Sequence, residues 1–251
     1  MSLSRTNKNW NQLGIDEPLW SILNDKNRKG KAWETNEFFQ TGEKEINDVL
    51  AYLKELPITL KKDRALDFGC GVGRLTRALK KHFREVHGVD AAVSMIKWAK
   101  EYDPEKSCHY HVNTENNLSL FENNAFNFVY SNITLQHMEP IHAGNYIKEF
   151  IRIIKPTGVA IFQIPSEQRG SKSMPQKGVL SIIKNLLPSF IKEFYRNIRY
   201  GKKGFIEMFG TPREKIIALV SEARGHVIDI KETKDAGENW TSYRYTVKKS
   251  S

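Results

Sequence analysis

The stretch that decides the fold reads Ala65-Leu66-Asp67-Phe68-Gly69-Cys70-Gly71-Val72-Gly73-Arg74-Leu75. A short apolar strand at 64–68 runs directly into three alternating glycines, and a helix at 74–83 follows. Glycine lets the backbone turn tightly and lets a ligand approach the main chain. The N-terminus of the following helix adds unpaired N–H groups and the positive end of a dipole. We therefore expect a strand–turn–helix unit that binds a ligand at its turn.

The next predicted strand, at 85–89, ends in Asp90, whose carboxylate can accept hydrogen bonds from both ribose hydroxyls of a nucleoside. The glycines follow a Gly-x-Gly-x-Gly spacing, and Arg74 stands where a dinucleotide fingerprint has its third glycine. Asp67, beside the turn, would repel a pyrophosphate but would attract a positively charged group. The pattern favours S-adenosylmethionine, a nucleoside with a cationic amino-acid part, over the NAD of an oxidoreductase.

The rest of the chain alternates between strands and helices. Further apolar strands are predicted at 107–112, 126–131, 159–164, 227–230 and 243–247, and helices at 42–56, 94–102, 145–154 and 211–224. This alternation implies βαβ crossovers and a parallel sheet, and the last two strands are expected to pair antiparallel. We predict an α/β fold with a Rossmann-like, doubly wound, seven-stranded sheet that is mostly parallel and has an antiparallel edge strand.

The 251 residues divide into a predicted N-terminal helical cap at 1–56 and a Rossmann-like domain at 57–251. The cap is expected either to close over the ligand or to pack on the sheet edge, through the aromatic residues Trp10, Trp20, Trp33, Phe38 and Phe39. A basic insertion at about 166–210 shows helical apolar spacing from position 179, which predicts two short helices.

Composition indicates a cytoplasmic protein. No apolar run reaches the roughly 18 residues that span a bilayer, and the N-terminus lacks the layout of a signal peptide. Cys70 and Cys108 are interpreted as reduced thiols. The net charge of +10, from 39 basic and 29 acidic residues, favours an anionic partner. The basic insertion leaves open an anionic substrate, a peripheral contact with lipid headgroups or a merely solvated face.

Four further segments extend the motif around the glycine turn. They are Asn113–Leu118, Phe126–Asn132, Leu135-Gln136-His137-Met138 and Lys155-Pro156-Thr157-Gly158. Together with the turn and Asp90, they resemble the ordered motifs of class I S-adenosylmethionine-dependent methyltransferases of the small-molecule type. The resemblance covers about residues 42–165. It implies methyl transfer from S-adenosylmethionine to an oxygen, nitrogen or carbon nucleophile.

The resemblance also implies the cofactor site. The turn would hold the amino-acid part of the cofactor through Asp67, Gly69, Cys70, Gly71, Gly73 and Arg74. Asp90 would bind the ribose, Asn113, Thr114, Glu115 and Asn116 the adenine with Met95 near it, and Ala91 would also contact the cofactor. Ser131 and Asn132 complete the set, and the acceptor would sit above residues 131–137.

His137 is the candidate catalytic residue. It follows the fourth strand, at the carboxyl end of the sheet where ligands bind, and an imidazole there could take a proton from a hydroxyl or amine nucleophile. The alternative is a histidine that only lines the pocket. No metal site is expected at Cys108, His109 and His111, because only the two histidines share a strand face and no second group of ligands has suitable spacing.

We therefore expect methyl transfer to a small-molecule or lipid-like acceptor. Two alternatives remain open at this point: a non-catalytic scaffold that keeps the fold, and a nucleic-acid methyltransferase. The second is disfavoured, because Ser131-Asn132-Ile133-Thr134 stands where a base-flipping Asn/Asp-Pro-Pro-Tyr motif would follow the fourth strand. The sequence determines neither the acceptor nor the oligomeric state.

Overall fold

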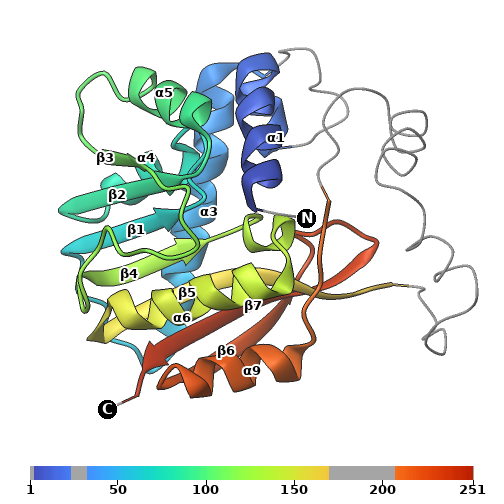
Figure 1. Ribbon diagram of the computed structural model, residues 1–251. Coiled ribbons are helices and arrows are strands. Elements are labelled where there is room, and N and C mark those ends of the chain that lie inside the picture. Colours follow the sequence, from blue (N-terminus) through green and yellow to red (C-terminus); the bar gives the residue numbers. More distant parts are fainter. Residues whose placement is uncertain (1–2, 24–32, 170–206, 251) are drawn as a thin grey trace, which may run out of the picture.

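The computed structural model describes residues 3–23, 33–169 and 207–250 (Figure 1). Its centre is a seven-stranded sheet in the order β3-β2-β1-β4-β5-β7-β6. The strands are β1 (Arg64–Phe68), β2 (Glu85–Asp90), β3 (His109–Val112), β4 (Phe126–Ser131), β5 (Ile154–Gln168), β6 (Gly225–Thr233) and β7 (Trp240–Lys249). β3, β2, β1, β4 and β5 pair in parallel, whereas β7 is antiparallel to both β5 and β6. The predicted doubly wound sheet with its antiparallel pair at one edge is confirmed.

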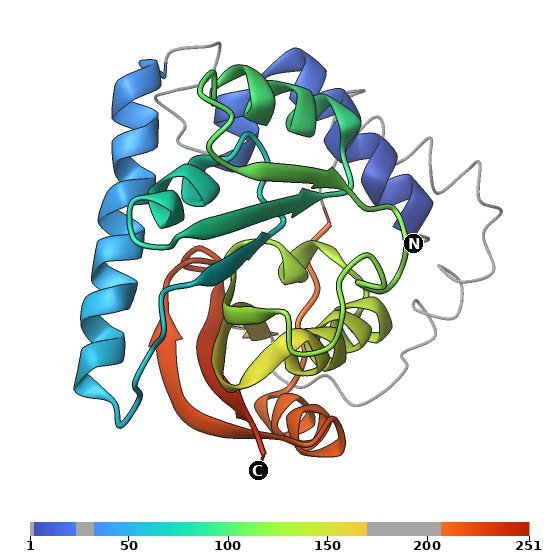
Figure 2. The same cartoon turned by 90° about the vertical axis from the view of Figure 1, so that its left-hand side faces the viewer.

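Helices cover both faces of this sheet (Figures 1 and 2). α3 (Thr35–Glu55) and α4 (Arg74–Lys80) pack on one face, and α6 (Pro140–Ile153) and α9 (Arg213–Glu222) on the other. Successive strand residues point to opposite faces: Ala65 belongs to the core under α3, and Leu66 to the core under α6. Burial on both faces explains why apolar residues occupy successive positions of the central strands, although buried polar residues such as Asp67, His87 and Asn127 interrupt them.

The N-terminal helices lie over the carboxyl ends of the strands. α1 (Leu3–Asp16) is fixed to α5 (Val93–Glu101) by three hydrogen bonds, one of which runs from the Ser94 N–H to Asn11 Oδ1 at 3.0 Å. Ser94 Oγ donates to the Asn11 carbonyl at 2.7 Å, and Trp98 Nε1 donates to the Gly14 carbonyl at 2.9 Å. α2 (Pro18–Ile22) follows α1 directly.

Some of the N-terminal aromatic residues pack in a core cluster, and one lines the cavity of the candidate site. Phe38 and Phe39 are buried in a core cluster with Met95, and Trp33 packs against that cluster. Trp10 lines the cavity described below. The division at residue 56 stays a prediction, although the buried face of α3 shares one core with β1 and α4.

The predicted basic insertion falls mostly outside the described residues, as do both helices expected within it. Its first residues continue β5, which extends to Gln168. Among the described residues, no helix combines the length and the apolar character that crossing a membrane would require.

A close contact between α3 and α4 depends on one glycine. A Cβ atom at Gly42 would lie 2.5 Å from the Arg74 carbonyl oxygen and 2.9 Å from Arg74 Cγ. Because the first of these atoms is backbone, a side chain at position 42 would push the two helices apart.

We predict that Gly42→Val lowers the free energy of unfolding by about 1–3 kcal/mol, the usual cost of overpacking a core. Denaturant unfolding measures this loss. Asn47→Val places the same side chain on the exposed face of α3 and should change stability by no more than about 0.5 kcal/mol. Equal stability of the two variants would contradict the proposed contact.

Candidate functional site

A cavity of about 570 Å³ opens at the carboxyl ends of β1, β2 and β4, where the strand order reverses. Ligands of open α/β sheets bind at such a reversal, since neighbouring connections leave the sheet in opposite directions there. The sequence-predicted residues among its lining are Gly69, Cys70, Gly71, Arg74, Asp90, Ala91, Met95, Asn113, Asn132 and His137. Thr6, Asn7 and Trp10 close the cavity from α1.

The glycine turn forms the floor of the cavity. Gly69 has φ 76° and Gly71 has φ 52°, in the left-handed region that side chains disfavour. A Cβ atom at Gly69 would lie 2.2 Å from the side chain of Thr134, and one at Gly71 would lie 2.6 Å from Ile22. Both positions therefore need glycine for conformation and for space.

Asp90 connects the end of β2 to this turn. Its Oδ2 accepts a hydrogen bond from the Gly71 N–H at 2.9 Å, and its Oδ1 accepts one from the Ala92 N–H at 2.8 Å. Burial raises the pKa of the carboxyl above its ordinary value, although these N–H groups oppose the shift. Each carboxylate oxygen keeps a further lone pair for a ligand donor.

Glu45, on α3, organises the other side of the turn. Its Oε2 lies 2.8 Å from Arg74 Nη2. Its Oε1 accepts hydrogen bonds from the Tyr130 hydroxyl at 2.9 Å and from Asn132 Nδ2 at 2.8 Å. Burial alone would raise the pKa of Glu45, but Arg74 and the hydrogen-bond donors outweigh it and lower the pKa below its ordinary value. Sequence reasoning missed Glu45, because no local pattern links a residue on this helix to the turn.

Two polar atoms beside the turn lack a hydrogen-bond partner among the described residues. They are Arg74 Nε and Asn132 Oδ1, both buried. Because Asn132 Nδ2 donates to Glu45, its Oδ1 is the atom left free. An unsatisfied buried polar atom costs about 1–3 kcal/mol. Arg74 and Asn132 both line the cavity, but less than 1 Å² of each of these two atoms is accessible, so neither atom faces the cavity in this arrangement.

Six predicted site residues do not line the cavity: Asp67, Gly73, Thr114, Glu115, Asn116 and Ser131. Asp67 is buried beneath the turn, where its Oδ2 accepts a hydrogen bond from Thr76 Oγ1 at 2.7 Å. Burial raises the pKa of Asp67 to about 7, and the Thr76 hydrogen bond opposes this shift. Ser131 Oγ donates to the Phe68 carbonyl at 3.1 Å. These two side chains therefore support the turn and the neighbouring strand.

Of the residues predicted to contact the adenine after β3, only Asn113 lines the cavity, whereas residues 114–116 do not. Asn113 lines the cavity, and its Nδ2 donates to the Asn117 carbonyl at 2.8 Å, which folds the segment back on itself. The Tyr146 hydroxyl donates to the Glu115 carbonyl. Asn113 therefore shapes the loop that Thr114, Glu115 and Asn116 continue.

His137 lies in the short helix η2 (Leu135–His137), and both of its ring nitrogens have contacts. Nδ1 lies 3.0 Å from the Glu207 carbonyl, and Nε2 lies 3.2 Å from Gln136 Nε2. A carbonyl only accepts hydrogen bonds, so Nδ1 carries the proton and Nε2 carries a lone pair. Burial lowers the pKa of His137 to about 4. The imidazole is therefore neutral at physiological pH, with its accepting nitrogen beside the cavity.

With this geometry in place, comparison with known proteins is informative. A family model described as "Methyltransferase domain" matches residues 66–162, which include the glycine turn, Asp90 and His137. Residues 66–162 are therefore similar to a methyltransferase domain. The resemblance drawn from the sequence motifs is thereby confirmed.

Curated relatives match part of this chain. Malonyl-[acyl-carrier protein] O-methyltransferase of Halorhodospira halophila is 30% identical over 122 residues, 48% of this chain and 40% of that protein. Ubiquinone biosynthesis O-methyltransferase of Coxiella burnetii is 32% identical over 119 residues, 47% of this chain and 50% of that protein. The chain thus spans at most half the length of these two relatives, and the match concerns the methyltransferase domain.

Solved structures match almost the whole chain and support the fold. Magnesium protoporphyrin IX methyltransferase of Synechocystis PCC 6803 superposes with a TM-score of 0.63 and 17% identity, and covers 99% of this chain and 100% of that one. A SAM-dependent methyltransferase of Leishmania major gives a TM-score of 0.65 and 13% identity, with 98% and 82% covered.

We predict that Glu45→Gln lowers the free energy of unfolding by about 1.5–3 kcal/mol, as expected for hydrogen bonds to a charged group. Denaturant unfolding at neutral pH measures it. The control Glu43→Gln, on the same helix, removes an exposed ion pair with Lys81 and should cost about 0–1 kcal/mol.

The difference in stability between the wild type and Glu45→Gln should depend on pH. The pKa of Glu45 is lowered in the folded state, so its stabilisation is complete above the ordinary value of 4.5 and is lost as the pH falls through the lowered value. The difference between the wild type and Glu45→Gln should therefore shrink on acidification. A difference that does not change with pH would contradict an ionised Glu45.

Proposed function

We propose that this chain is a methyltransferase that uses S-adenosylmethionine and methylates a small-molecule or lipid-like acceptor. The observation that carries the proposal is the glycine turn held to the Asp90 carboxylate by the Gly71 N–H, at the cavity where the strand order reverses. When bound, S-adenosylmethionine supplies a methyl carbon made electrophilic by a positively charged sulfur.

The residues around the turn suit the functional groups of this cofactor. Arg74 and Asn132, which line the cavity, would lie beside its amino-acid part, and Asp90 would accept hydrogen bonds from its ribose hydroxyls. Gly69 and Gly71 would let it approach the backbone. Ala91, Met95 and Asn113, which line the cavity, would surround the adenine.

The acceptor would occupy the part of the cavity nearest His137. Trp10, Ile133, Met138 and Met208 line this cavity and suit an apolar group, while Lys234 adds a positive charge that suits an anionic one. Both relatives described above are named O-methyltransferases, which supports oxygen as the nucleophilic atom. We also infer a cytoplasmic location, and a cap at 1–56 that closes the site through α1.

His137 would act on the nucleophile as a neutral imidazole. Its Nε2 can accept the hydrogen bond of an acceptor hydroxyl if the Gln136 amide moves aside. Because the protonated His137 imidazole has a pKa of about 4, Nε2 is a weak base before the reaction begins. The hydroxyl proton becomes strongly acidic as its oxygen forms the bond to carbon, so a weak base placed correctly is sufficient.

We predict that Asp90→Ala weakens binding of S-adenosylhomocysteine at least about tenfold, the equivalent of one hydrogen bond to a charged group. Calorimetry measures the affinity, and transfer of a labelled methyl group to extract components measures activity. Asp48→Ala, on the exposed face of α3, should leave both unchanged. Equal affinity of the wild type and Asp90→Ala would refute the site, and no binding by the wild type would favour a scaffold.

We predict that His137→Gln lowers kcat about 10²–10⁴-fold, the range of a general base, without changing the affinity for S-adenosylhomocysteine. In the wild type, kcat should not depend on His137 ionisation between pH 6 and 9, because its pKa of about 4 lies below that range. Steady-state kinetics across this range test both statements. A loss of less than tenfold in kcat would leave His137 as a residue that only lines the pocket.

A further inference from the structure

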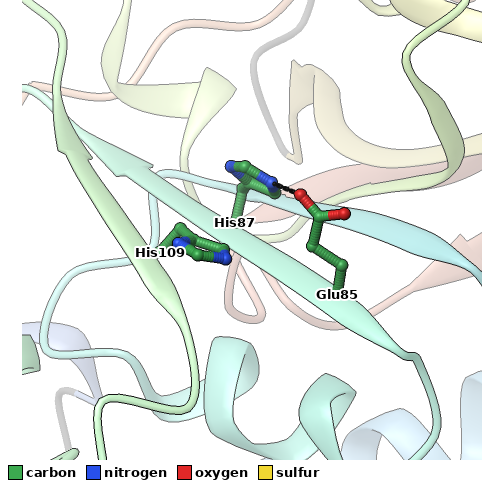
Figure 3. Close-up of side chains that lie close together, drawn as sticks. All are labelled: Glu85, His87 and His109. Atoms are coloured by element: carbon green, nitrogen blue, oxygen red, sulfur yellow. Dashed lines mark hydrogen bonds and ion pairs between the residues drawn. The ribbon is translucent and has the colours of Figure 1, made fainter.

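A second polar cluster lies where β2 meets the edge strand β3. The parallel register pairs His87 with His109, so their side chains share one face of the sheet. Glu85, two residues before His87, shares this face as well. Figure 3 shows Glu85 and His87 on β2 with His109 beside them on β3. Ligand atoms of the three residues lie within 4.8 Å of one another, and none of the three lines the cavity.

One atom of this cluster has contacts that cannot all be favourable. His87 Nε2 lies 2.7 Å from Glu85 Oε1 and 3.1 Å from Arg64 Nη2. A carboxylate only accepts and a guanidinium only donates, whereas one imidazole nitrogen can either donate or accept. If Nε2 carries the proton, that proton is repelled by the Arg64 donor. If Nε2 carries the lone pair, that lone pair is repelled by the Glu85 oxygen. A cation coordinated by both the lone pair and the carboxylate would remove this conflict.

His111 gives His87 the orientation that a metal ligand needs. Its Nε2 lies 3.0 Å from His87 Nδ1, and the two rings stack with centroids 5.2 Å apart. If His87 donates from Nδ1 to His111, its Nε2 lone pair is directed at Glu85. Metal-binding histidines commonly donate their second N–H to such an acceptor, which fixes the tautomer and the ring.

The surroundings allow an ion to enter and to be held. His109 is exposed and Glu85 is partly exposed, while His87 is buried with its ring against Phe121 and Phe126. The cluster is thus open to solvent on one side and has an apolar wall on the other. Two imidazoles and one carboxylate form a ligand set preferred by zinc and similar divalent ions.

We propose that Glu85, His87 and His109 bind one divalent transition-metal ion of the zinc type, with His111 orienting His87. The ion connects β2 to β3, the four-residue strand at the edge of the sheet. The proposed site departs from the expectation from the sequence, which named Cys108, His109 and His111 and found no second group of ligands with suitable spacing. It does not depend on the proposed methyl transfer.

Arg64 competes with the ion for the same groups. Its Nη2 lies 3.0 Å from Glu85 Oε1 and occupies the position of a cation between Glu85 and His87. Binding of a divalent ion must displace this guanidinium, because like charges repel. Removing the Arg64 charge should therefore strengthen metal binding, whereas removing a ligand should weaken it.

The test is a titration of the full chain with ZnCl₂ against a chromophoric chelator. We expect one ion per chain, and a loss of affinity of about 10–100-fold or more in His109→Ala and in His111→Ala, the range for ligands and their supporting partners. Arg64→Gln should bind more tightly than the wild type. His226→Ala removes an exposed histidine on β6 and should bind as the wild type does.

Co²⁺ absorption and the effect of Zn²⁺ on Tm distinguish metal binding from a purely structural role of these side chains. The d–d absorption of bound Co²⁺ should appear in the wild type and not in His109→Ala, without thiolate charge transfer from Cys108. Zn²⁺ should raise the Tm of the wild type, of His226→Ala and of Arg64→Gln but not that of His109→Ala, and Tm values without metal show whether each variant is folded. Wild-type protein that binds no Zn²⁺, equal affinity in His109→Ala, or unchanged affinity in Arg64→Gln would overturn the assignment.

Discussion

The hydrogen bond from the Gly71 N–H to the Asp90 carboxylate joins the two halves of the candidate active site. It fixes the glycine turn against the end of β2, and the Gly69 and Cys70 N–H groups reinforce it by donating to the Val89 carbonyl at 2.8 and 3.0 Å. This backbone path requires left-handed residues. Because the turn is held from the β2 side, the N-terminus of α4 has a fixed direction at the edge of the cavity.

On the other side of the cavity, an ion pair between Glu45 and Arg74 holds α3 against α4. Glu45 is 19% exposed and Arg74 only 5%, so their ion pair is largely removed from water. Such a pair is favourable only when its remaining hydrogen-bonding groups are satisfied. Tyr130 and Asn132 satisfy the Glu45 oxygens, whereas Arg74 Nε and Asn132 Oδ1 stay open. The same network that stabilises the packing of α3 on α4 thus also positions Arg74 and Asn132, which line the cavity.

Sequence reasoning succeeded where the signal was local. The glycine turn, Asp90, Asn132 and His137 all lie within a few residues of a strand end, and topology brings those ends together. It was less successful for Asp67: its position beside the turn suggested contact with a cation, but the side chain points to Thr76 instead. It missed Glu45, Glu85 and His87, because each gains its role from a partner on another element.

The sequence by itself determined which segments form the strands of a mostly parallel sheet and where the turn lies, since apolar periodicity, glycine spacing and a terminal carboxylate are properties of short segments. The tertiary structure decided which side chains face the cavity and how they are charged. His137 is an example: its position was visible in the sequence, but its low pKa depends on burial and its tautomer on the Glu207 carbonyl. Likewise, His109 gains His87 and Glu85 as neighbours only through the register of β2 and β3. Burial and register arise from contacts between distant segments, which no local pattern encodes.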